Sequence, residues 1–181
     1  GVNIGGSNVT AGALSVLALP QSALVDGSIN DISDLGTLPS TGGIILNESA
    51  STTNIDLSNG PFLVRGTSVR GTNFNALVEG NIDVKGGRLT ISGMTLNAAD
   101  IRFESTDSIG MDVSGSVVNA QGDVQFVGAS NGTFQNVDIR HETGELEVSF
   151  GGNFSGSQTD FDGRDLIVSA GHGIDYSGSA I

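Results

Sequence analysis

The chain has 181 residues and a formal net charge of −13, with 28 Gly, only seven Lys and Arg, and no Cys. This length suits one domain, and the lack of Cys excludes a disulfide framework. The scarcity of basic residues argues against nucleic acid as a partner, and the absence of an apolar run of about 20 residues argues against membrane insertion. The acidity suits a soluble, self-repelling surface or, alternatively, binding of divalent cations.

The N-terminal part of the chain differs in composition from the rest. Residues 1–25 are rich in Gly and Ser with scattered apolar residues, which predicts an extended N-terminal arm. Residues 26–43 contain the one segment with helical spacing, whose apolar members are Ile29, Ile32 and Leu35. A helix this short needs a surface to lie on, so we expect it to cap the open end of a repetitive domain over residues 44–181.

A six-residue phrase recurs in that domain: an apolar residue, a small or polar residue, Gly or Asn, two variable positions and an apolar residue. Its copies begin at Val64, Ile91, Val113, Phe134, Phe154 and Tyr176, the fifth with its closing apolar residue displaced by two. From Ile91 onward the copies are roughly 20 to 22 residues apart, and repeats of this length indicate stacked units that bury a core only together.

A second phrase keeps nearly the same period and consists of a polar, usually acidic, residue followed by an apolar–x–apolar triplet. Its copies begin at Asn81, Asp100, Asp123, Glu145 and Asp165. The alternation puts the first and third triplet residues on one face, as in a β-strand. Turn-forming residues fill the intervals, and no segment after Val64 sustains helical spacing. The sequence therefore predicts an all-β solenoid.

Four segments carry a resemblance to a known family: residues 38–46, 55–57, 62–66 and 89–96. They are similar to the opening of pectate-lyase-like right-handed parallel β-helices, most of all those of bacteriophage tailspikes. The later repeats also resemble filamentous-haemagglutinin-type secreted adhesins. The resemblance implies a right-handed parallel β-helix over residues 44–181. It indicates fold more than activity, because unrelated functions share such coils.

This resemblance implies a non-enzymatic structural or adhesive protein of a virion or cell surface, such as a bacteriophage spike, fibre or decoration protein. The alternative is a secreted bacterial adhesin or extracellular fibre subunit, and a third hypothesis is a polysaccharide lyase or hydrolase. Expected partners are further copies of the chain, as a trimer, other virion or surface proteins, and a cell-surface glycan. We assign no catalytic residue and no organic cofactor.

Stacking of the coils places the acidic residues of the second phrase in one row: Asp100, Asp123, Glu145 and Asp165. These carboxylates either cap turns and face water, or bridge adjacent coils through Ca²⁺. Neighbours at the coil spacing of about 4.8 Å also suit a retaining glycosidase, although any solenoid with acidic turns has that spacing.

Two smaller features complete the set of candidates. Asp160, Asp162 and Asp165 resemble a calcium loop without the order of an EF-hand, and are the candidate metal ligands. His141 and His172 lie in segments that read as turns, with no motif around them, so both are expected at the surface.

Overall fold

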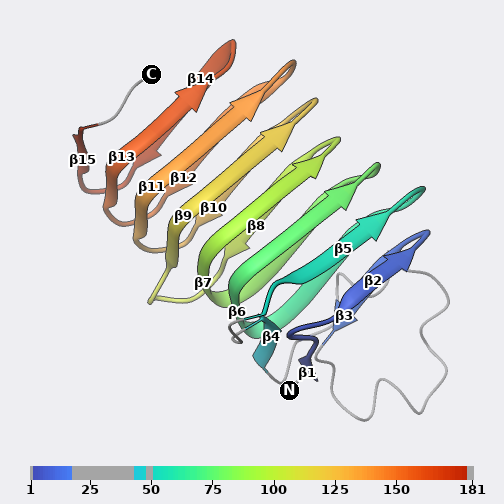
Figure 1. Ribbon diagram of the computed structural model, residues 1–181. Helices are drawn as coiled ribbons and strands as arrows, with labels where there is room; N and C mark the ends of the chain where they lie inside the picture. Colours follow the sequence, from blue (N-terminus) through green and yellow to red (C-terminus); the bar gives the residue numbers. More distant parts are fainter. Residues whose placement is uncertain (1, 18–42, 48–50, 179–181) are drawn as a thin grey trace, which may run out of the picture.

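The computed structural model describes residues 2–17, 43–47 and 51–178, which form a parallel β-solenoid. Successive coils lie beside one another along one axis (Figure 1), and each strand pairs in parallel with strands of the neighbouring coils. The predicted all-β parallel β-helix is thereby confirmed. Within the described ranges there is no helix, and the segment expected to form the capping helix lies outside them.

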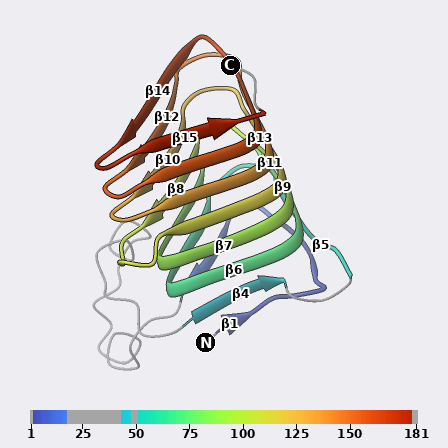
Figure 2. The same ribbon diagram turned by 90° about the vertical axis from the view of Figure 1, so that its left-hand side faces the viewer.

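The pairing divides the coils among three parallel sheets, here named faces A, B and C. Face A contains β1 (Val2–Asn3), β4 (Gly43–Asn47), the middle of β6 (Phe62–Val78) and β7 (Ile82–Ala98), the first halves of β9 (Met111–Ala120), β11 (Gly132–His141) and β13 (Phe154–Asp162), and β15 (Ile174–Ser177). Figure 2 shows this face as a regular stack from β4 to β15.

The other two faces follow in chain order within each coil. Face B contains β2 (Asn8–Ala11), β5 (Thr53–Leu57) and the last parts of β6, β7, β9, β11 and β13. Face C contains β3 (Leu14–Leu17), the first parts of β6 and β7, β8 (Ile101–Ser105), β10 (Val124–Gly128), β12 (Glu145–Phe150) and β14 (Asp165–Ala170).

Residues 2–17, which lie within the predicted extended N-terminal arm (residues 1–25), pack on the body of the same chain and form its first coil. Strands β1, β2 and β3 pair in register with β4, β5 and β6. Val16 is buried, and Val9 and Leu14 pack against the core. Scattered apolar residues are sufficient to form a coil in this segment, because each short face of a coil needs only one or two inward side chains.

The apolar–x–apolar triplets stack on face C as predicted. Their first residues occupy one inward row, which consists of Ile82, Ile101, Val124, Leu146 and Leu166. All but Leu166 are at most 1% exposed. Alternation within each triplet therefore fixed both the burial and the register of this face.

The first phrase stacks on face A with two differences from the prediction. Its row consists of Gly71, Ile91, Val113, Phe134, Gly156 and Tyr176. Phe154 lies two residues earlier, opposite Gly132. In each of these two rows, a phenylalanine of one coil therefore lies opposite a glycine of the next coil. This arrangement lets the Phe134 and Phe154 rings meet edge to face, with centroids 5.2 Å apart. The copy at Val64 is not in this row, because Val64 pairs with Val84 on face C.

Phe134 lies at the junction of an aromatic cluster inside the later coils. Its ring is fully buried and contacts three others edge to face, with centroids 4.9 Å from Phe126, 5.2 Å from Phe154 and 6.1 Å from Phe150. Rings from faces A and C therefore interdigitate along the axis.

We expect Phe134→Ala to lower the free energy of unfolding by about 3–5 kcal/mol, because it opens a cavity that three rings cannot fill. Urea unfolding followed by circular dichroism measures this loss. Thr133→Val, at the exposed neighbouring position, is the control and should change stability by about 0.5 kcal/mol or less. Equal effects of both variants would contradict this account of the core.

The corner between faces A and B has a constant backbone feature. One residue there adopts a left-handed conformation, with φ between 51° and 72°, in these positions: Gly6, Asn73, Gly93, Gly115, Asn136, Gln158 and Gly178. Gly and Asn tolerate this conformation, whereas a residue such as Gln is strained by about 1–2 kcal/mol. The Gly or Asn of the first phrase is therefore a corner residue in the copies that begin at Ile91, Val113, Phe134 and Tyr176, whereas Gln158 occupies this corner in the coil of Phe154.

We expect Gly115→Ala to lower the free energy of unfolding by about 1–2 kcal/mol through backbone strain. An added Cβ would have its nearest neighbour, the Gly93 nitrogen, at 3.9 Å, so no clash contributes. Gln158→Gly should instead raise stability by up to about 1 kcal/mol. Gly12→Ala is the control, because nothing lies within 4 Å and φ is outside the left-handed region; it should stabilise by about 0.4–1 kcal/mol.

Candidate functional site

Outward side chains form rows along the axis, because the strands are in register and repeat about every 4.8 Å. Each face therefore presents a ladder of one position per coil. The three faces differ in chemistry: face A carries mainly hydroxyl side chains, face B mainly Asn and Asp, and the early coils of face C carry ion pairs.

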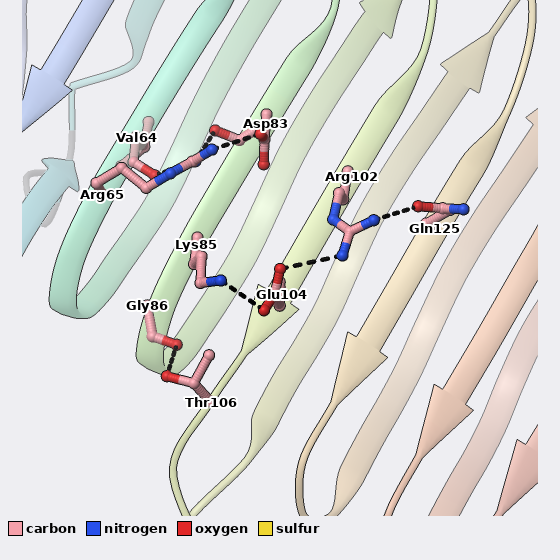
Figure 3. Close-up of polar contacts among 9 residues, drawn as sticks. All are labelled: Val64, Arg65, Asp83, Lys85, Gly86, Arg102, Glu104, Thr106 and Gln125. Carbon is pink, nitrogen blue, oxygen red and sulfur yellow. Dashed lines mark hydrogen bonds and ion pairs between the residues drawn. The ribbon is translucent and has the colours of Figure 1, made fainter. Parts of the chain in front are cut away.

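The ion-pair cluster on face C begins with Arg65, whose side chain is 11% exposed. Its guanidinium donates to the Asp83 carboxylate at 2.5 Å and to the backbone carbonyls of Val64 and Asp83 at 2.9 and 3.0 Å. Because these two side chains come from adjacent coils, the pair fastens one coil to the next (Figure 3).

Glu104 is the centre of the second part of this cluster. Its carboxylate lies 2.7 Å from the Lys85 ammonium and 3.0 Å from the Arg102 guanidinium, which also donates to Gln125 at 2.8 Å. Partial burial alone would raise the pKa of Glu104. The hydrogen bonds and charges of Lys85 and Arg102 outweigh burial and hold that pKa below its ordinary value of 4.5.

The predicted acidic row exists, and two of its members cap the next coil. The Asp100 carboxylate accepts the backbone N–H of Asp123 at 2.9 Å, and the Asp123 carboxylate accepts that of Glu145 at 2.9 Å. Glu145 pairs with Asp165 in register. Turn capping is therefore confirmed for Asp100 and Asp123, whereas Ca²⁺ bridging stays a prediction.

The three candidate metal ligands lie at the corner between faces B and C. Asp160 and Asp162 point outward from β13, Asp165 begins β14, and all three are exposed. They are not brought together into a metal-binding group, since the described part of the chain contains no cluster of three or more His, Cys, Asp or Glu suited to a metal ion.

His141 is buried, at 6% exposed, so the prediction of a surface position is wrong for this residue. It continues the inward alternation of face B and stacks in register on Ala120. Gly163 leaves room for its ring, because a side chain there would collide with the imidazole. Its Nδ1 lies 3.3 Å from the carbonyl oxygen of Thr143. His172 is exposed, as expected.

A groove of about 480 Å³ crosses four coils of face B. Two outward rows form its walls: Asn8, Asn54, Asn75 and Thr95 on one side, and Thr10, Asp56, Leu77 and Asn97 on the other. Between them the lining residues are Val9, Ile55 and Ala76. No pattern in the sequence identified this groove.

Asparagine amides on this face are joined into ladders. The Asn54 side-chain amide donates to Oδ1 of Asn8 at 2.9 Å, and the Asn75 side-chain amide donates to Oδ1 of Asn54 at 3.1 Å. A second step joins Asn119 to Asn97 at 3.1 Å. These bonds fix the orientation of the amides, which makes the groove wall an ordered array of donors and acceptors.

Comparison with models of known protein families, with curated proteins and with solved structures finds no match. The resemblance to pectate-lyase-like β-helices and tailspikes therefore stays a prediction, beside a solenoid fold that is established. Among the residues described, no helix has the length and apolar character to cross a membrane.

We expect Glu104→Gln to lower the free energy of unfolding by about 1 kcal/mol near pH 7, because Lys85 and Arg102 lose their carboxylate. A depressed pKa stabilises the fold above the unfolded-state pKa, and this contribution is lost as the pH falls through the lower folded-state pKa. The difference between variant and wild type should therefore shrink below pH 4.5.

Thermal unfolding from pH 3 to pH 8 measures this dependence. Glu147→Gln, on the same face and outside the ion pairs of Glu104, serves as the control and should show a smaller difference at pH 7. A pH-independent effect of Glu104→Gln would contradict the ion-pair explanation.

Proposed function

We propose that the chain is a non-enzymatic structural and adhesive rod, belonging to a spike, fibre or decoration protein of a virion. The observation that carries the proposal is one continuous apolar core joined to polar rows on every face. Buried core residues extend from Val16 to Phe161, with partly buried members from Ile4 to Tyr176. Eight successive strands of face A span roughly 34 Å, so the module is a stiff spacer.

The use of its charged groups also supports a structural role. Several carboxylates are engaged in ion pairs or backbone hydrogen bonds that link neighbouring coils: Asp83, Glu104, Asp112, Asp100 and Asp123. Carboxylates used in this way hold the coils together and are unsuited to acid–base work, which requires a proton-exchanging group free to reach substrate.

Partners of the same proposal are further copies of the chain, as a trimer, and a cell-surface glycan. Among the described residues, three large apolar side chains on the sides of the rod are exposed at 45–57%: Leu77, Ile109 and Ile167. Ile174, 52% exposed, continues the inward row of Phe154 in the last described coil. Side-by-side association would remove the side chains of Leu77, Ile109 and Ile167 from water, which contributes about 1.5–3 kcal/mol for each one that becomes fully buried. The secreted adhesin is the alternative that the same rod allows.

The decisive test is the location of the polypeptide in its source culture. An antibody to the recombinant chain should detect it in particles banded on a density gradient, at constant ratio to the major particle protein. Detection in the bacterial envelope or secreted fraction, and not in particles, would favour the adhesin and overturn the virion assignment.

Light scattering tests the trimer separately. We expect the purified protein to have a mass about three times that of the 18.3 kDa chain. A monomer at all concentrations tested would remove the trimer from the proposal and leave the location test unaffected.

A further inference from the structure

We propose that the groove on face B binds a short stretch of neutral, hydroxyl-rich polysaccharide whose chain runs parallel to the stack axis. This inference rests on the adhesive function proposed above and gives it a site and a class of ligand. The groove and its walls are described residues, contributed by β2, β5, β6 and β7.

The dimensions of the groove fit a linear ligand. Its walls are two residues apart on each strand, or about 6.7 Å, and each wall repeats every coil, or about 4.8 Å. Four coils give a length of roughly 14 Å, and the volume of about 480 Å³ lies within the range of small-ligand sites. The long direction follows the rows, so a bound chain would meet a new pair of side chains at each coil.

The walls offer the groups that recognise hydroxyls. Sugar hydroxyls both donate and accept, and an Asn amide presents a donor and an acceptor side by side. In the ladder, Asn54 donates one N–H to Asn8 and accepts from Asn75, which leaves its second N–H and further lone-pair capacity for a ligand. Because the ladder already fixes the amides, little side-chain entropy is lost on binding.

The charge of the groove selects against acidic sugars. Its lining includes no Lys or Arg and one carboxylate, the exposed Asp56. A uronic acid would find a like charge and no cationic partner, whereas the hydroxyls of a neutral sugar can donate to Asp56. Leu77, 57% exposed in the same wall, offers an apolar surface to the C–H face of a ring.

The test uses the 181-residue chain and four defined probes: neutral tetrasaccharides of glucose, mannose and N-acetylglucosamine, and tetragalacturonic acid. Calorimetry gives the affinity, and amide chemical shifts map the site. We expect at least one neutral probe to bind, with shifts confined to residues 8–10, 54–56, 75–77 and 95–97. Tetragalacturonic acid should bind at least about tenfold more weakly.

The variant Asn54→Ala/Asp56→Ala removes one group from each wall at exposed positions. It should weaken binding about tenfold or more, because groups in both walls lose their hydrogen bonds to the ligand. Asn153→Ala removes an exposed Asn that lies just before β13, outside the groove, and should leave the affinity unchanged. Urea midpoints of both variants identify any loss caused by unfolding.

No binding by any neutral probe, tighter binding of tetragalacturonic acid, or shifts outside the groove would each overturn the inference. Equal affinities of the two variants for a neutral probe would do the same. If the polypeptide is found in particles and the groove binds no neutral probe, only this site fails. If the groove binds and the polypeptide is absent from particles, only the virion assignment fails.

Discussion

In-register pairing between neighbouring coils is the constraint on which the other features depend. One coil is too thin to bury its own interior, so each apolar row is complete only when the next coil covers it. The same register creates the outer contacts, in which a side chain meets its counterpart one coil away. Arg65 with Asp83 on face C and Asn54 with Asn8 on face B are two chemically different results of one backbone arrangement.

The left-handed corner residues preserve that register. A turn of fixed geometry between faces A and B ensures that the strand after it starts at the same place in every coil. Asn73 and Gln158 show that this corner admits residues with side chains, at a cost in backbone strain for Gln158. Stability is therefore shared between the apolar interior, which favours stacking, and the corners, which determine how the coils align.

The sequence predicted the solenoid and the inward row of face C from Ile82 to Leu166, because strict alternation leaves one choice of face. It predicted face A with a shift of two residues in one coil. The copy of the first phrase there begins at Phe154, whereas the residue in line with Phe134 is Gly156. Burial of His141 depended on the space beside it, which periodicity does not reveal. The groove depended on Asn8 and Asn54, which are neighbours although 46 residues separate them in the chain. Only register could place them together.

The alternation of rings and glycines inside the later coils makes the order of the coils matter. Phe134 faces Gly156 and Gly132 faces Phe154, so each coil is shaped for the neighbours it has. A duplicated copy of residues 132–153 would set phenylalanine on phenylalanine in one row and glycine on glycine in the other, crowding one site and hollowing the next. Lengthening this rod by tandem copying therefore requires compensating substitutions at the new junction, because the coils are not interchangeable.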